Sequence, residues 1–182
     1  STLNFTTDNQ IRNIRTKEEF HNMSSTGNFL IDNDIDLRYS NRTIYGEFNG
    51  NIDFQGHKLL LNVKNSASRV FEKLGKGAIF KNMDMHIWYD EARSRYDTLT
   101  DYSSATFSNI MITIEEAVTT PAEQISFLVR VNRGTVDHFV VHNKAEIQVT
   151  RYFGFISNYI YGTVKNGYLY GEKINGNHNS SL

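Results

Sequence analysis

The stretch Ala105-Thr106-Phe107-Ser108-Asn109 is one of five copies of a short pattern that recurs along the chain. The pattern has a small residue at its first position, an apolar residue at its third and a polar residue at its fourth. The copies follow one another in steps of 28, 27, 29 and 28 residues and begin at Gly50, Ala78, Ala105, Gly134 and Gly162. A fixed period between about 20 and 50 residues is typical of repeat proteins, in which each repeat stacks on the last.

The alternation inside the pattern indicates a β-strand, because neighbouring side chains of a strand point to opposite faces. The apolar third position is therefore expected to face inward, where its members form one core column. This column consists of Ile52, Phe80, Phe107, Val136 and Val164. The polar fourth position is expected to form a surface column, which consists of Asp53, Lys81, Ser108, Asp137 and Lys165.

The first and fifth positions indicate where the chain turns. A small first residue suits a tight corner, where glycine escapes the steric penalty of a Cβ atom. The fifth position is asparagine in three copies, Asn82, Asn109 and Asn166, and departs from it at Phe54 and His138. Asparagine side chains at equivalent positions can hydrogen-bond along the stack.

The composition fits a globular chain of 182 residues, with 39% hydrophobic and 21% charged residues. The net charge of −1 gives no reason to expect a nucleic-acid or anionic membrane partner. Cysteine is absent, which excludes disulfides and thiolate metal sites, and no apolar run approaches the roughly 20 residues of a membrane span. The first residues lack the features of a signal peptide. We therefore expect either a processed chain or, preferably, a fragment of a longer protein.

The predicted fold is a right-handed parallel β-helix of about five coils with a short capping helix at its N-terminal end. The solenoid domain is expected to span residues 1–174, with the capping helix within 16–24 and a frayed tail or linker at 175–182. Thr16 and Glu19 have the spacing of a capping box. Such a helix would cover strand edges and core that an open end exposes.

Two polar stretches interrupt the rhythm of strands and turns. They are Tyr89 to Ser104 and Glu115 to Gln124, the second of which holds the sole proline. We expect each of them to replace one side of its coil with a loop or a short helix.

Motifs for metal binding are weak in this sequence. His-Glu-x-x-His does not occur, and His138 and His142 fall on a predicted strand, where residues four apart lie about 13 Å from each other. Asp32, Asp34 and Asp36 have the spacing of a calcium loop, but that loop requires glycine and glutamate at later positions that are occupied by other residues here. No cofactor or metal is expected.

Some β-helices are carbohydrate-active enzymes, which makes a glycosidase-like site an alternative for this fold. Glycoside hydrolysis needs two carboxylates about 5–9.5 Å apart. The acidic residues of the surface column, Asp53 and Asp137, have lysine or serine as column neighbours rather than acids. We therefore expect no catalytic residues in this chain.

Two groups of residues are candidates for binding a partner. Tyr159 and Tyr161, and likewise Tyr168 and Tyr170, alternate with an apolar residue, so all four are expected on the outside. The alternative is that these tyrosines pack between coils. A second group lies in the first polar stretch and has residue types enriched at interfaces, although a solvated loop would also account for it; its members are Arg93, Arg95, Tyr96 and Tyr102.

The segment from Thr16 to Asn82 resembles a known family of modules. It contains Asp34-Ile35-Asp36-Leu37, then Phe48-Asn49-Gly50-Asn51-Ile52-Asp53-Phe54-Gln55-Gly56-His57, and finally Ala78-Ile79-Phe80-Lys81-Asn82. These motifs resemble β-solenoid modules with GLUG-type repeats in bacterial surface proteins, most of all the solenoid that precedes the catalytic domain in streptococcal zinc metalloproteases of the immunoglobulin A1 protease family.

This resemblance implies a non-catalytic module of a larger exported protein, either secreted or attached to the surface of a Gram-positive bacterium. Its expected role is to position or recognise a host protein, with immunoglobulin A1 as the leading candidate, for a downstream metalloprotease. The alternatives are an adhesin or a structural spacer and, last, a carbohydrate-active enzyme.

Overall fold

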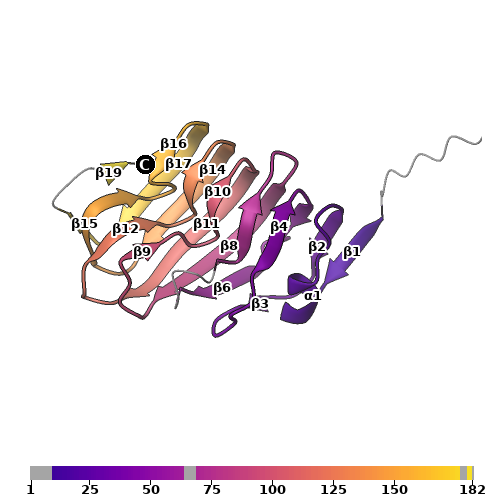
Figure 1. The fold of residues 1–182 in the computed structure, drawn as a ribbon, viewed down its shortest axis with the longest axis horizontal. Helices are drawn as coiled ribbons and strands as arrows, with labels where there is room; N and C mark the ends of the chain where they lie inside the picture. The colour runs from indigo at the N-terminus through magenta and orange to yellow at the C-terminus, as the bar shows by residue number, and fades with distance from the viewer. Residues whose placement is uncertain (1–9, 64–68, 177–179, 182) are drawn as a thin grey trace, which may run out of the picture.

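The chain winds repeatedly through three parallel sheets to form a β-solenoid (Figure 1), which confirms the predicted all-β fold. The computed structural model describes residues 10–63, 69–176 and 180–181. The strands of the first sheet are β1 (Ile11–Ile14), β2 (Asn28–Ile31), β3 (Ile35–Asp36), β5 (Asn51–Asp53), β6 (Lys58–Asn62), β8 (Ile79–Tyr89), β11 (Thr106–Ala117), β14 (Thr135–Asn143) and β17 (Thr163–Gly171).

The second and third sheets complete each coil. The second consists of β4 (Ile44–Phe48), β7 (Phe71–Leu74), β10 (Thr100–Ser103), β13 (Val129–Asn132) and β16 (Tyr159–Ile160). The third consists of β9 (Arg95–Tyr96), β12 (Ala122–Ser126), β15 (Ile147–Gly154), β18 (Ile174–Gly176) and β19 (Ser180–Ser181). Neighbours in each sheet come from successive coils, and the five strands of the second sheet correspond to about five coils.

The predicted core column is present. Phe107 pairs with Phe80 on one side and Val136 on the other, and the column continues to Ile52 and Val164. The rings of Phe80 and Phe107 lie 5.1 Å apart in an edge-to-face arrangement, and both side chains are fully buried. The surface column is also in register, since Ser108 pairs with both Lys81 and Asp137.

The fifth position bends the strand, which the alternation alone did not predict. Asn82, Asn109, His138 and Asn166 all have φ between 54° and 58°, in the left-handed region that asparagine tolerates best among residues with a Cβ. Residues on either side of this position pair across the sheet, Ser108 with Asp137 and Ile110 with Phe139. Asn109 and His138 between them do not form a pair in the ladder. Each long strand of the first sheet therefore turns a corner at this position.

The first copy of the pattern is the exception. Here Phe54 is fully buried in the core, and the left-handed conformation falls one residue later, at Gln55 with φ of 51°. The Gln55 side chain bonds to the carbonyl oxygen of Ile31 and the carboxylate of Asp32 in the preceding coil. Phe54 therefore departs from the asparagine column because it belongs to the core.

The small residue at the first position has a different cause from the one expected. Gly134 and Gly162 have no positive φ, so the strain of an L-residue is not the reason. A Cβ atom added at Gly134 would lie 1.9 Å from the carbonyl oxygen of Ala105, and one at Gly162 would lie 2.0 Å from that of Gly134. Close contact between the backbones of successive coils requires glycine at these two positions.

The N-terminal helix forms as predicted, over Lys17–His21 as α1. The hydroxyl of Thr16 accepts a hydrogen bond from the amide of Glu19, at 3.1 Å, and the Glu19 carboxylate contacts the same hydroxyl at 3.4 Å rather than the backbone of Thr16. Phe20 is fully buried, with its ring 6.0 Å from that of Phe71. The helix thus fills the end of the core below β1 and β2 (Figure 1).

The two polar stretches are not loops, and that prediction was wrong. The first contains β9 and β10, and the second contains the end of β11 and the start of β12, joined by the short turn at 118–121. Their inward polar groups are hydrogen-bonded: the Thr98 hydroxyl donates to the carbonyl oxygen of Ser126 at 2.7 Å and therefore accepts a hydrogen bond from the Tyr89 hydroxyl at 2.8 Å. Buried hydroxyl groups are tolerated in a core when they are bonded in this way.

The C-terminal segment also differs from the expected frayed tail. β18 reaches Gly176 and pairs with β15, and Ser180–Ser181 pairs with the end of the same strand. Strand pairing of the third sheet therefore continues past residue 174. No helix in the described part of the chain is long and apolar enough to cross a membrane.

Candidate interaction surface

A row of alternating cations and tyrosine rings crosses the outer face of the second sheet. Lys73 on β7 lies 5.4 Å from the ring of Tyr102 on β10, and the guanidinium of Arg133 lies 5.4 Å from the same ring. Arg133 also lies 4.8 Å from the ring of Tyr161, just after β16. Because each residue belongs to a different coil, the row spans four successive coils.

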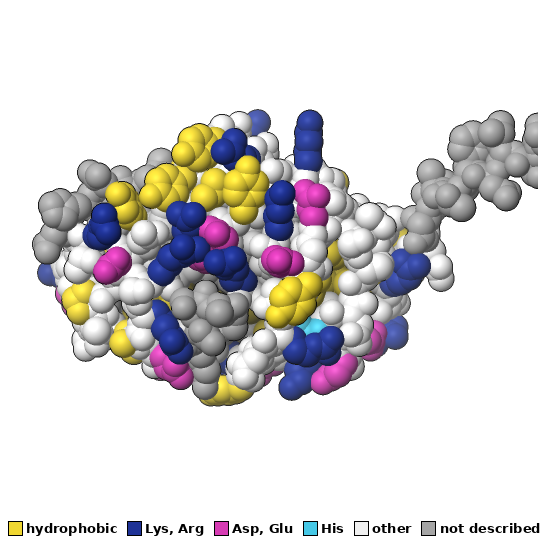
Figure 2. Space-filling view, viewed as in Figure 1, with side chains coloured by type: hydrophobic (Ala, Val, Ile, Leu, Met, Phe, Trp, Pro, Cys, Tyr) yellow, Lys and Arg dark blue, Asp and Glu magenta, His cyan; other side chains and the backbone are white. Residues whose placement is uncertain are grey.

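A second row starts beside the first and continues around the corner onto the third sheet. The Arg130 guanidinium lies 5.4 Å from the Tyr159 ring, which lies 5.9 Å from Tyr152. Arg151 lies 5.6 Å from the ring of Tyr152. We call the residues of these two rows the Tyr/Arg face; they are Lys73, Tyr102, Arg130, Arg133, Arg151, Tyr152, Tyr159 and Tyr161. Figure 2 shows hydrophobic and basic side chains intermingled on the upper part of this view.

An ion-pair network adjoins the Tyr/Arg face at Arg130. Asp101 lies between three arginines, Arg69, Arg95 and Arg130, and Asp97 is bound by two of them. Burial raises the pKa of Asp101, but the hydrogen bond from Arg130 and the charge of the three arginines outweigh burial and hold this pKa below its usual value. The Asp101 carboxylate therefore stays ionised, and both aspartates hold the arginine side chains in place.

Two of the four tyrosines predicted as contact residues belong to this face. Tyr161 is 66% exposed and Tyr159 is half-buried beneath Arg130. The other two, Tyr168 and Tyr170, are exposed on β17 of the first sheet, where Tyr170 stacks on His142 with ring centroids 4.3 Å apart. The four tyrosines thus lie on two different sheets.

Of the second predicted group, Tyr102 belongs to the Tyr/Arg face, and the other three residues do not form an exposed loop. Tyr96 is only 2% exposed, and its hydroxyl donates to the carbonyl oxygen of Glu91. Arg95 binds the buried Asp97 through two hydrogen bonds of 2.8 and 2.7 Å, and Arg93 pairs with Glu91. Tyr96 is therefore part of the core, and Arg95 belongs to the network under the face.

Sequence reasoning missed four members of the face, Lys73, Arg130, Arg133 and Arg151. A signal was present, because Lys73 and Tyr102 lie in one outer column with Val131 and Tyr159 and follow the same period of about 28 residues. To detect this column, the period of about 28 residues must also be applied to the residues of the second sheet. The polar and aromatic residues of the second sheet carry no conspicuous motif that would suggest this step.

The histidines and aspartates weighed as metal ligands take part in separate contacts. His138 pairs with Asp137 at 2.8 Å, and Asp36 binds Arg38. Asp34 accepts a hydrogen bond from the amide of Lys58. In the described ranges no group of three or more histidine, cysteine or acidic side chains is placed to hold a metal ion.

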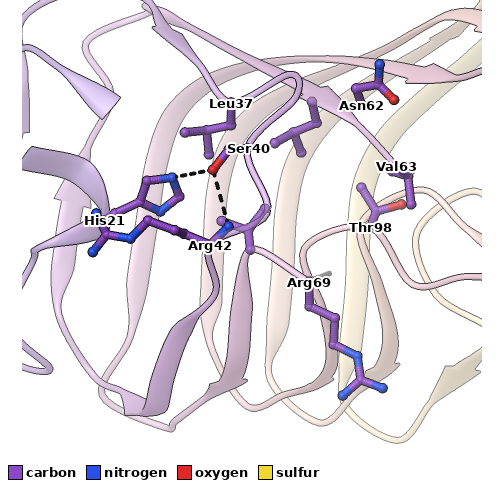
Figure 3. A pocket seen from close by; sticks show the side chains of 10 residues that line it. His21, Leu37, Ser40, Arg42, Asn62, Val63, Arg69 and Thr98 are labelled. Atoms are coloured by element: carbon purple, nitrogen blue, oxygen red, sulfur yellow. Dashed lines mark hydrogen bonds between the residues drawn. The ribbon is translucent and has the colours of Figure 1, made fainter. Parts of the chain in front are cut away.

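The cavities lie away from the Tyr/Arg face. One of them, between α1 and the end of β6, is lined by His21, Ser40 and Arg42 among others (Figure 3). His21 and Ser40 are hydrogen-bonded at 2.8 Å across it, and its volume of about 20 Å³ suits roughly one water molecule. Larger hollows of about 400 and 390 Å³ are open grooves at the two ends of the solenoid. The Tyr/Arg face is therefore the stronger candidate for a binding surface.

No family model, curated protein or solved structure matches this chain.

Proposed function

We propose that this solenoid is a non-catalytic recognition module of a larger exported protein and that the Tyr/Arg face is the surface with which it binds a protein partner. The observation that carries the proposal is the arrangement of four tyrosine rings and four basic side chains in two stacked rows across neighbouring coils.

Tyrosine and arginine are the residue types that dominate binding energy at protein interfaces. Tyrosine offers a large contact area for little loss of conformational entropy, and stacking against a guanidinium restricts the ring further. A regular parallel sheet underneath holds these side chains on a rigid platform, which reduces the entropic cost of binding. The extended shape of the face suits a macromolecule better than a small ligand, which needs a concave site.

The partner that the family resemblance suggests is human immunoglobulin A1, and the parent protein would then be a zinc metalloprotease that acts on it. The test is surface plasmon resonance of the purified domain against immunoglobulin A1, with immunoglobulins A2 and G as controls. Saturable binding selective for A1 supports the proposal. An absence of binding at tens of micromolar to all three would contradict this partner and favour an adhesin for another ligand or a spacer.

Two double variants separate the Tyr/Arg face from the other tyrosines. Tyr159→Ala with Tyr161→Ala removes two rings from the face, whereas Tyr168→Ala with Tyr170→Ala removes two exposed rings from the first sheet. The first variant is expected to weaken partner binding at least tenfold with unchanged thermal stability. Equal losses from both variants would show that the face is not the contact surface.

A further inference from the structure

The charges on the Tyr/Arg face are not evenly compensated. Three of its four cations have an acidic neighbour: Lys73 lies 4.0 Å from Glu47, Arg130 binds Asp101, and Arg151 lies 3.9 Å from Glu123. Arg133 has no carboxylate within ion-pair distance among the described residues, and its guanidinium makes only the two ring contacts. Arg133 is therefore the cation of the face that has no carboxylate partner among the described residues.

The backbone around Arg133 is fixed by bonds between coils. Its amide donates to the carbonyl oxygen of Ser103 at 2.7 Å, and the amide of Tyr161 donates to the carbonyl oxygen of Asn132 at 2.9 Å. The close contact at Gly134 holds the next residue against the coil below. The arginine and the rings on either side of it therefore keep their relative positions.

Stacking uses the flat faces of a guanidinium and leaves its N–H groups, which lie in the plane, able to donate. A carboxylate accepts two such bonds in parallel, and this geometry gives the strongest arginine contacts. Ordering by the two rings lowers the entropy that an exposed arginine otherwise loses on binding.

We infer that Arg133, held between Tyr102 and Tyr161, is the anchor point for a carboxylate of the protein partner, supplied by an exposed aspartate or glutamate side chain. This inference rests on the proposed function and specifies the chemistry of the partner. The excess positive charge at Arg133 and the free in-plane donors favour an acidic segment over a neutral or basic one.

The test uses the ¹⁵N-labelled chain and two capped pentapeptides, with one glutamate or one glutamine flanked by glycines. The Arg133 Nε–Hε signal, assigned by its loss in Arg133→Lys, is followed by NMR as each peptide is added. The glutamate peptide is expected to shift this signal saturably, and the glutamine peptide to leave it nearly in place. Equal shifts from both peptides, or a larger shift at Arg93, would overturn the inference.

A second variant tests the role of the rings. Tyr102→Leu keeps apolar volume beside Arg133 but removes one π face, and it is expected to weaken glutamate-peptide binding about two- to fivefold. Unchanged affinity for the glutamate peptide would contradict a role for the Tyr102 ring in holding Arg133. The peptide result is independent of the immunoglobulin experiment: selective immunoglobulin binding that Arg133→Lys leaves intact refutes the anchor alone, whereas peptide binding without any immunoglobulin partner refutes the named partner alone.

Discussion

Asn109 donates a hydrogen bond from its side-chain amide to the side-chain oxygen of Asn82 in the preceding coil, at 2.8 Å. Asn82 in turn donates to Asp53 at 3.0 Å, so the bonds connect three successive coils at one corner. Both asparagines have left-handed backbones, which places their side chains one above the other. The corner and the hydrogen bonds between coils therefore depend on the same residue.

Replacing Asn109 separates these two contributions. Asn109→Ala loses the hydrogen bond and places an ordinary residue in the left-handed region, at a cost of about 2 kcal/mol in the free energy of unfolding. Asn109→Gly keeps the backbone conformation and is expected to cost less. Urea denaturation of both variants measures the difference, and Ser108→Ala is the control. Equal costs for alanine and glycine would show that backbone strain is unimportant here.

Substitution of Phe107 in the core column is expected to cause a large loss of stability, because its ring is fully buried between Phe80 and Val136. Phe107→Ala should lower the free energy of unfolding by about 3–5 kcal/mol through lost burial and the cavity left behind. Met111 lies on the same strand but is 47% exposed, so Met111→Ala should cost less than about 1 kcal/mol. Similar urea midpoints for the two variants would contradict the inward assignment of Phe107.

The close contact between coils predicts that Gly134 cannot be replaced even by alanine. The added Cβ would meet the carbonyl oxygen of Ala105, so the two coils must move apart, at a cost of about 2–3 kcal/mol. Thr135→Ala, next along the chain, removes atoms and should change stability by less than about 1 kcal/mol. Thermal melting checks both, and a wild-type melting temperature for Gly134→Ala would show that the coils can separate freely.

Arg95 and Arg93 are expected to behave differently. Arg95→Ala removes two hydrogen bonds from Asp97, whose side chain is 4% exposed, and should destabilise the domain by about 1–3 kcal/mol. Arg93 pairs with the exposed Glu91, so Arg93→Ala should cost less than about 1 kcal/mol. Chemical denaturation distinguishes them. If both variants melt like the parent chain, the network under the Tyr/Arg face is not structural.

The pKa of His21 predicts a loss of stability in mild acid. Burial, and then the charge of Arg42, lower this pKa below the ordinary value of 6.5 (Figure 3). The unfolded chain therefore binds the proton more readily, so the contribution of His21 is fully present above about pH 6.5 and declines as the pH falls. Urea midpoints at pH 8 and pH 5.5 should differ more in the parent chain than in His21→Gln. The same difference in both would exclude His21 as the cause.

The first sheet could be predicted from the sequence because its repeat is simple. An apolar residue such as Phe107 faces inward and a polar neighbour such as Ser108 faces outward in every copy, and both columns are found in register. The capping helix was predictable for a similar reason, since Thr16 and Glu19 occupy fixed positions relative to each other.

The second and third sheets could not be predicted as well, because their inward positions include polar residues. Thr98, Thr100 and Ser103 are buried, and their hydroxyl groups bond to the protein rather than to water. Such residues give a segment the composition of a loop, although it is a strand. The same misreading placed Tyr96 on the surface and separated Tyr102 from the tyrosines beside it, so the Tyr/Arg face emerged only from the structure.

The register between coils has a consequence for how such a chain can change in length. Three core positions of β11, Phe107, Ile110 and Ile112, have apolar counterparts in both β8 and β14, one period away on either side. A tandem duplication of one period would therefore insert a coil that finds suitable neighbours above and below without disturbing the rest. Each added coil would lengthen the outer platform by about 4.8 Å, and its outward residues could diverge freely. Reach and recognition could thus evolve separately, the first by copying periods and the second by substitution on the outer face.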